Sequence, residues 1–180
     1  MQLCRLDENI FTVHAFLSER ECRELIVQSE LSGYRNADVQ VGVSRSYLSN
    51  IRNNHRVNWI SESLAEQLWK KLSHMTMPNI EGKRAIGLSP HFRFYRYTPG
   101  QKFNMHKDGR QSVSGGVTMM TLLVYLNDDY EGGCTQFRQS NLEVHAAIGK
   151  SLIFEHHLWH KGNEVLTGVK YVLRTDIVYQ

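Results

Sequence analysis

From His91 onward, the hydrophobic residues of this chain follow the two-residue period of β-strands rather than the period of a helix. Residues 91–98, HFRFYRYT, alternate in this way, and residues 119–127, MMTLLVYLN, form a long apolar run that is typical of a central strand. Further strands are predicted at 134–138, 142–146, 151–155 and 170–179. A half-chain of many short strands must pack a sheet against a sheet, as a sandwich or a barrel.

The first half of the chain predicts helices instead. After a short strand at 10–16, the sequence Ser18-Glu19-Arg20-Glu21 has the capping-box pattern of a helix start, and Gly33 is a suitable end for that helix. A second helix is predicted over about 61–73, because its apolar residues recur at helical spacing.

Two or three helices followed by seven or eight strands predict an α+β fold. We expect a single domain over residues 1–180, with a helical N-terminal part of about 1–80 and a core of about 90–180. The predicted core is a double-stranded β-helix, or jelly roll, of about eight antiparallel strands. A small barrel of this kind leaves room for one ligand, so polar residues on inward faces mark a candidate site.

Composition narrows the class of protein. The net charge is only +3 and the basic residues are scattered, so no nucleic acid partner is expected. The three cysteines form no close pair, which argues against a disulfide framework and favours a reducing compartment. The sequence shows no signal peptide pattern and no apolar run long enough for a membrane span, so we expect a cytoplasmic protein.

The strongest candidate for chemistry is His106-Lys107-Asp108, the only His-x-Asp/Glu in the chain. In an extended segment, residues i and i+2 point the same way, so both side chains can reach one metal ion. Two histidines and one carboxylate form the ligand set of non-haem Fe(II) oxygenases. The same residues also suit a turn in which Asp108 only caps the backbone, and the pair by itself leaves both interpretations open.

A third ligand has four candidates in the sequence. They are His145, His156, His157 and His160, and for each of them the commoner fate is a structural histidine in the core. The strand that follows His160 favours that residue over the others, because the strand has one strongly polar face.

That strand, 170–179, places Lys170, Arg174 and Asp176 on one face and mainly apolar residues on the other. If the apolar face packs under a helix, Lys170 and Arg174 point into the mouth of the barrel. A buried lysine is costly unless an anion compensates it, so an inward Lys170 predicts an anionic ligand. The alternative is a strand that faces solvent with an array of surface charges, and the pattern alone favours neither.

Three segments resemble the prolyl 4-hydroxylase-like family of Fe(II)- and 2-oxoglutarate-dependent dioxygenases. RFYRYTPGQKFNMHKDG (93–109) is similar to the first metal-binding segment of that family, and TLLVYLNDDYEGGCTQF (121–137) to its central strand and the following turn. IGKSLIFEHHLWHKGNEVLTGVKYVLRTDIVY (148–179) resembles its closing segment. The likeness covers about residues 90–179, and FLSERECRELIVQSE also resembles the helix that precedes this core.

The resemblance implies roles for particular residues. The residues implied to hold Fe(II) are His106, Asp108 and His160. Those implied to bind the distal carboxylate of 2-oxoglutarate are Lys170, Tyr97 and, as a weaker candidate, Thr121. Those near the substrate or cosubstrate mouth are Arg174 and Trp159, although a structural salt bridge from Arg174 to Asp176 or another acid is an equal alternative.

The implied activity is hydroxylation of an unactivated C–H bond with release of succinate and CO2. The cofactors would be Fe(II), 2-oxoglutarate and O2, and the need for ascorbate stays open. The substrate would be a prolyl or other residue in a peptide or protein, with a free amino acid or small metabolite as the alternative. A cupin-like metal protein that does not use 2-oxoglutarate, and a binding barrel without catalysis, are the rival classes. The polar segment 44–56 is either a substrate lid or a solvated loop.

Overall fold

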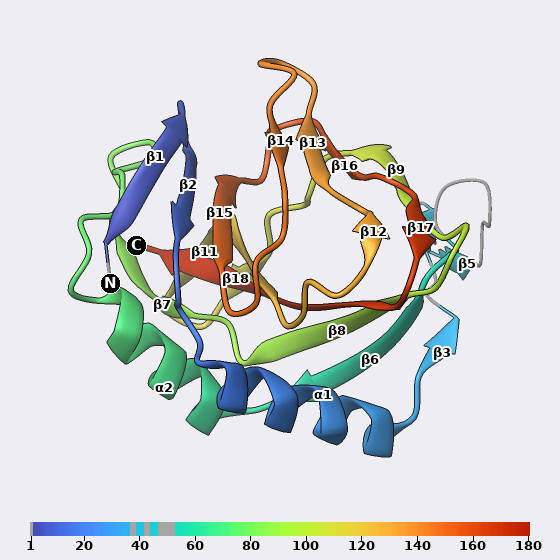
Figure 1. Cartoon of the computed structure of the whole chain (residues 1–180). Helices are drawn as coiled ribbons and strands as arrows, with labels where there is room; N and C mark the ends of the chain where they lie inside the picture. Colours follow the sequence, from blue (N-terminus) through green and yellow to red (C-terminus); the bar gives the residue numbers. More distant parts are fainter. Residues whose placement is uncertain (1, 37–38, 42–43, 47–52) are drawn as a thin grey trace.

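The computed structural model describes the backbone of residues 2–36, 39–41, 44–46 and 53–180, and the side chains of 2–36 and 53–180. Figure 1 shows its plan: two sheets face each other, and both helices lie on the outer side of the larger sheet. The fold is mostly antiparallel β-structure, and it confirms the predicted α+β jelly roll.

The larger sheet has ten strands in the described part of the chain, and the central strand predicted from the sequence lies in its middle. Its main path runs in the order β1 (Leu3–Asp7), β2 (Ile10–Val13), β15 (Ser151–Glu155), β11 (Gly116–Tyr125), β18 (Lys170–Tyr179), β8 (His91–Tyr97), β6 (His55–Ile60) and β3 (Arg35–Asn36). Two further strands pair with this path, β10 (Ser112–Val113) with β11 and β7 (Ala85–Leu88) with β18.

The smaller sheet covers part of the larger one and has four strands. Their order is β14 (Glu143–Val144), β13 (Thr135–Phe137), β16 (His160–Gly162) and β9 (Phe103–His106). Two separate pairs complete the strands of the described residues, β12 (Glu131–Gly132) with β17 (Val165–Thr167), and β4 (Val39–Val41) with β5 (Ser44–Ser46).

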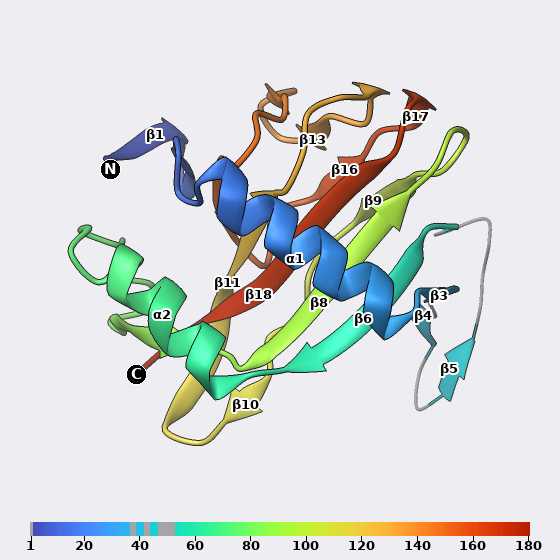
Figure 2. The same ribbon diagram turned by 60° about the horizontal axis from the view of Figure 1, so that its bottom comes forward.

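Both predicted helices form, and the first begins where its capping box predicts. Helix α1 (Glu19–Ser32) has the complete capping box, in which Ser18 and Glu21 bond each other's backbone N–H groups, and it ends at Gly33 with φ of 78°. Helix α2 (Glu62–Leu72) is capped by the Ser61 hydroxyl, which accepts from the Leu64 N–H. Figure 2 shows α1 crossing in front of β18 and β8. In the described residues neither helix combines the length and the hydropathy that a bilayer span requires.

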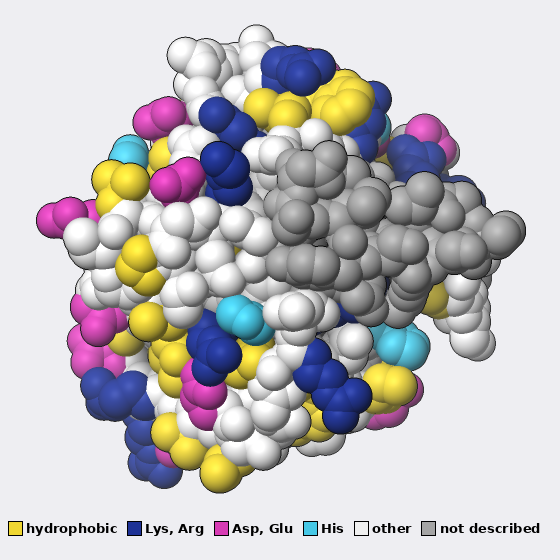
Figure 3. All heavy atoms as spheres, turned by 90° about the vertical axis from the view of Figure 1, so that its right-hand side faces the viewer, with side chains coloured by type: hydrophobic (Ala, Val, Ile, Leu, Met, Phe, Trp, Pro, Cys, Tyr) yellow, Lys and Arg dark blue, Asp and Glu magenta, His cyan; other side chains and the backbone are white. Residues whose placement is uncertain are grey.

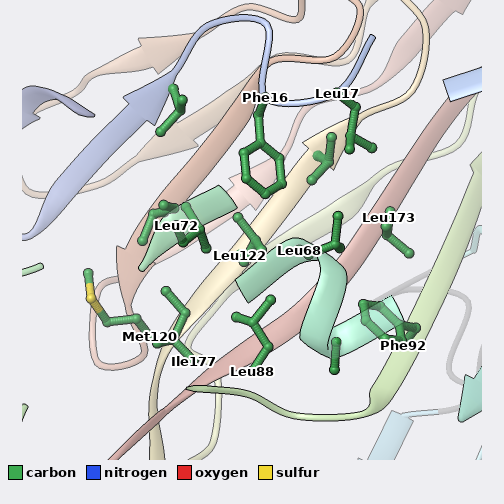
Figure 4. Close-up of a cluster of buried hydrophobic side chains, with 14 of the residues drawn as sticks. Phe16, Leu17, Leu68, Leu72, Leu88, Phe92, Met120, Leu122, Leu173 and Ile177 are labelled. Carbon is green, nitrogen blue, oxygen red and sulfur yellow. The ribbon is translucent and has the colours of Figure 1, made fainter. Parts of the chain in front are cut away.

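The main hydrophobic core lies between these helices and the outer face of the larger sheet. Figure 4 shows side chains from α2, β8, β11 and β18 pointing toward one another, with Phe16 and Leu17 entering from the turn before α1. On β18, Leu173 and Ile177 belong to this cluster. The apolar face of β18 therefore packs under the helices, and its other face is turned toward the smaller sheet.

The N-terminal part is less helical than the sequence predicted. Strands β1, β2 and β6 come from this part and extend the larger sheet at both sides. The sequence signal for β6, HRVNWI, is weak, because only Val57 is fully buried and the other positions of the strand are polar or partly exposed. Its pairing with β8 over six registered positions is a tertiary effect that local pattern does not reveal.

Candidate metal centre

His106, Asp108 and His160 converge between the two sheets. Each offers one ligand atom, and these three atoms all lie within 4.8 Å of one another. His106 ends β9 and is paired in register with His160 at the start of β16, so strand pairing alone brings the two imidazoles together. Asp108 follows two residues after His106, and its backbone N–H donates to the His156 carbonyl at 3.0 Å.

The tautomers of both histidines are set by backbone carbonyls. His106 Nδ1 lies 2.8 Å from the Asn104 carbonyl, and His160 Nδ1 lies 3.0 Å from the Leu158 carbonyl. A carbonyl oxygen only accepts, so each Nδ1 carries the proton and donates. Each Nε2 atom then carries the lone pair that can bind a metal, and each lies 3.8 Å from a different oxygen of Asp108.

Burial keeps these imidazoles neutral, which is the form that binds a metal. Desolvation lowers the pKa of His106 to about 3, with a further contribution from His160. Burial also lowers the pKa of His160. For Asp108, burial alone would raise the pKa of the carboxyl, but Arg174 together with His160 and His106 outweighs burial and holds the pKa below its usual range. The centre is therefore two neutral imidazoles and one carboxylate.

Both oxygens of Asp108 are held by neighbours. The Thr121 hydroxyl donates to Oδ2 at 2.6 Å, and Arg174 Nη2 lies 3.1 Å from Oδ1. The side chain of Asp108 is only 5% exposed. Thr121, expected to contact 2-oxoglutarate, orients this carboxylate and also lines the pocket.

Arg174 belongs to a buried charge network. Its Nη2 lies 3.0 Å from Asp176 Oδ1, and Asp176 also accepts from Arg93 Nη1 at 3.2 Å and faces His156 Nε2 at 3.3 Å. The structural salt bridge that the sequence offered as an alternative therefore exists, and it lies in the wall of the pocket. Sequence reasoning missed that Arg174 reaches Asp108 itself.

Lys170 points into the same pocket, as the polar face of its strand allows. It is 4% exposed, and its Nζ donates to the Gly133 carbonyl at 2.6 Å. Desolvation lowers its pKa to about 8, and no carboxylate among the described residues offsets that burial. The alternative of a strand face open to solvent is thereby excluded for Lys170.

Aromatic rings form the wall around this ammonium group. Its Nζ lies 5.2 Å from the ring centre of Tyr97 and 5.7 Å from that of Tyr125. Tyr125 was not predicted as a site residue, but it shares the inward face of β11 with Thr121, four residues earlier. The hydroxyl groups of Tyr125 and Thr135 lie 2.8 Å apart. Counting along β11 from Thr121 in steps of two residues leads to Tyr125, so the sequence did contain a signal for this residue.

The remaining predicted residues lie elsewhere. Trp159 is not among the residues that line this pocket; its ring instead contacts Lys107 and Arg138, at 5.3 and 4.8 Å from the ring centre. Of the other histidines considered as ligands, His145 is exposed, His157 pairs with Glu155, and His156 pairs with Asp176.

The suggested lid, 44–56, lies mostly outside the residues whose side chains are described. At its end, Asn53 accepts from the Lys102 N–H at 2.8 Å and so contacts the loop before β9. Figure 3 shows one face of the molecule, where Lys and Arg side chains are interspersed with acidic and hydrophobic ones rather than gathered in one block.

The donor set and the pocket fit the cofactors that the resemblance implied. Imidazole and carboxylate ligands suit Fe(II), and three protein ligands leave coordination positions open. The buried ammonium of Lys170, without a carboxylate partner in the described structure, suits one end of a dicarboxylate. The free volume of this pocket is about 40 Å³.

Comparison with known proteins supports the resemblance found in the sequence. Residues 92–175 match the 2OG-Fe(II) oxygenase superfamily. The chain is 27% identical over 143 residues to the Arabidopsis thaliana protein named "Probable prolyl 4-hydroxylase 8". That alignment covers 76% of this chain and 47% of the relative, so this chain spans about half the length of the plant protein.

Solved structures share the fold at low identity. The viral collagen prolyl hydroxylase of Paramecium Bursaria Chlorella virus-1, in its 2OG complex, aligns with a TM-score of 0.65 and 22% identity, over 94% of this chain and 95% of that one. A prolyl hydroxylase of Trichoplax adhaerens, in complex with a hypoxia inducible factor peptide, aligns with a TM-score of 0.71 and 15% identity, over 94% and 83%. Residues 92–175 of this chain therefore match the 2OG-Fe(II) oxygenase superfamily, and the resemblance to its prolyl 4-hydroxylase-like members is confirmed.

Proposed function

We propose that this protein is an Fe(II)- and 2-oxoglutarate-dependent dioxygenase that hydroxylates a C–H bond of an amino-acid residue in a peptide or protein. The observation that carries the proposal is the convergence of His106, Asp108 and His160 in a pocket that also buries Lys170. Iron and 2-oxoglutarate, when bound, would supply the oxidising chemistry, with succinate and CO2 as products.

Each residue of the pocket has a proposed part. His106, Asp108 and His160 would hold the metal, with Thr121 and Arg174 fixing the orientation of the carboxylate. Lys170 would pair with the distal carboxylate of 2-oxoglutarate, since an ammonium offers that group three donors. Tyr97 would pack its ring against this ion pair.

The pocket also excludes water from the reaction. Phe103 stacks on the His106 ring with centroids 3.5 Å apart, and Phe154 packs against His160 at 4.4 Å. These rings would hold the imidazoles in place and shield them from water on the side that faces the protein interior. A dry and rigid wall favours reaction with a positioned substrate over reaction with solvent.

A peptidyl substrate is proposed by analogy with the relatives. The Trichoplax adhaerens neighbour was solved with a peptide fragment, and the plant relative is named a prolyl 4-hydroxylase. Free thiols at Cys4, Cys22 and Cys134 support work in a reducing compartment such as the cytoplasm.

The test is succinate release that depends on a peptide substrate. Asp108→Ala removes the carboxylate ligand, and we expect it to abolish this release because the metal loses its only anionic protein ligand. Glu66→Ala, on the exposed face of α2, is the matched control and should retain full activity. Turnover by Asp108→Ala at the rate of the control would refute the assignment.

A further inference from the structure

A second, polar groove lies on the larger sheet beside the metal centre. It measures about 420 Å³ and is lined on β6 and β8 by Arg56, Asn58, His91 and Arg93, with Gln111 closing it. No Asp or Glu is among the described residues that line it. A groove with two guanidinium groups, an imidazole and two amides offers donors chiefly for an anion.

Strand register places this groove against the pocket of the metal centre. Asn58 is the registered partner of Arg93, and Arg93 is in turn the partner of Arg174. Directly paired residues in antiparallel strands project from the same face of the sheet. One row of side chains therefore runs from the groove, through Arg93, to the arginine that contacts Asp108.

The loop after Asp108 forms another side of the same groove. Gln111 follows Asp108 by three residues, and its backbone is held on β11 by two bonds with Thr118, both 2.9 Å long. The chain segment that carries a proposed metal ligand is thus also a wall of the groove. A group bound in the groove would lie next to the reacting centre.

The balance of charge favours an anion in this groove. The buried carboxylate of Asp176 is shared between Arg93 and Arg174, at 3.2 and 3.0 Å. The other acid in contact with Arg174 is Asp108, so the two buried acids only balance the two arginines. The lining of the groove adds no acid, and the Arg93 side chain, which is 20% exposed, presents its guanidinium to the groove.

We propose that this groove binds a carboxylate of the substrate, so that the enzyme prefers target residues flanked by an acidic side chain. The inference rests on the proposed function and specifies its substrate class. Arg93 acts as the specificity-determining residue because its guanidinium touches both the groove and Asp176. A guanidinium binds a carboxylate through two parallel bonds, which fixes the direction of the substrate as well as its charge.

The test uses two peptide libraries with a central proline, one with glutamate beside it and the other with glutamine. We expect about threefold to tenfold more succinate from the glutamate library, with the difference falling as salt is added. Binding of both libraries to the metal-free protein, measured by isothermal titration calorimetry, should show the same preference. The binding measurement does not need turnover, so it tests the groove even if the dioxygenase proposal fails.

Three variants separate the groove from general effects. Arg93→Gln should erase the preference for the glutamate library. Asn58→Asp, an exposed change opposite Arg93, should also reduce it strongly without removing any contact of the charge network. Arg96→Gln removes an arginine of the same strand that pairs with Glu30, and it should keep the preference of the wild type. Equal responses of the wild type to both libraries, or an unaltered preference in Asn58→Asp, would overturn the proposal.

Discussion

Lys170→Met is expected to stabilise the ligand-free protein and, at the same time, to remove its stabilisation by 2-oxoglutarate. Burial lowers the pKa of Lys170 from 10.5 to about 8, which corresponds to a cost of about 3 kcal/mol for holding the ammonium in the folded protein at pH 7. Methionine fills a similar volume without charge. It gives up the bond to the Gly133 carbonyl, worth about 1 kcal/mol, so a net gain of about 2 kcal/mol is expected.

The pH dependence gives this prediction a definite sign. Below about pH 8 both the folded and the unfolded wild type carry the proton on Lys170, so the full cost is present. Between about pH 8 and 10.5 the folded state releases the proton while the unfolded state keeps it, and the wild type gains stability. The stability gap between Lys170→Met and the wild type should therefore shrink as pH rises through this range.

Urea denaturation at pH 7 and pH 10 measures that gap, and repeating it with 2-oxoglutarate measures the ligand effect. At a hundred times its dissociation constant, a ligand stabilises the folded state by about 2.7 kcal/mol, which we expect for the wild type alone. Lys70→Met, an exposed lysine on α2, is the control and should behave as the wild type does. Two results would refute this reasoning. One is that Lys170→Met is less stable than the wild type at pH 7 and that the difference in their free energies of unfolding does not change with pH. The other is that 2-oxoglutarate still stabilises Lys170→Met.

Three further changes test the packing around the site and the fold. Thr121→Val removes the 2.6 Å bond to Asp108, and Mn(II) affinity, measured by electron paramagnetic resonance, should fall about tenfold; undiminished affinity would contradict the orienting role. Asp176→Asn leaves Arg174 without one of its buried partners and should cost about 3 kcal/mol at pH 7 in urea denaturation. Burial raises and Arg174 lowers the pKa of Asp176, to about 2 on balance, so its contribution is present above about pH 3.8 and lost as pH falls toward 2; the variant should not show that loss. Ser18→Ala breaks the capping box of α1 and should lower stability by about 1 kcal/mol, seen as a lower Tm.

Local pattern predicted the elements whose signals are contained in a few neighbouring residues. The capping box at Ser18 predicted the start of α1, and the helical spacing of apolar residues predicted α2. Alternation predicted β8 and β18 within a residue. The face of β18 that bears Lys170 was also predictable, because an apolar face on one side leaves only one place for the polar side chains.

Strands β9 and β16 and the charge network were not predictable in the same way. These two strands have four and three residues, and each exists because it pairs with a partner distant in sequence. The contact between Arg174 and Asp108 depends on the position of the loop after β9 relative to β18. No local sequence pattern predicts that position. Adjacency to His160 does not fix the direction of the Trp159 side chain, whose ring lies against Lys107 and Arg138.

The central claim is that one pocket holds a ferrous ion on His106, Asp108 and His160 and a dicarboxylate at Lys170. Its most direct measurement is the visible absorption spectrum of the protein with Fe(II) and 2-oxoglutarate in the absence of oxygen. We expect a weak charge-transfer band that gives a purple colour, and that disappears in Asp108→Ala. A protein that takes up Fe(II) but shows no band with 2-oxoglutarate, as a cupin-like metal protein would, contradicts the claim.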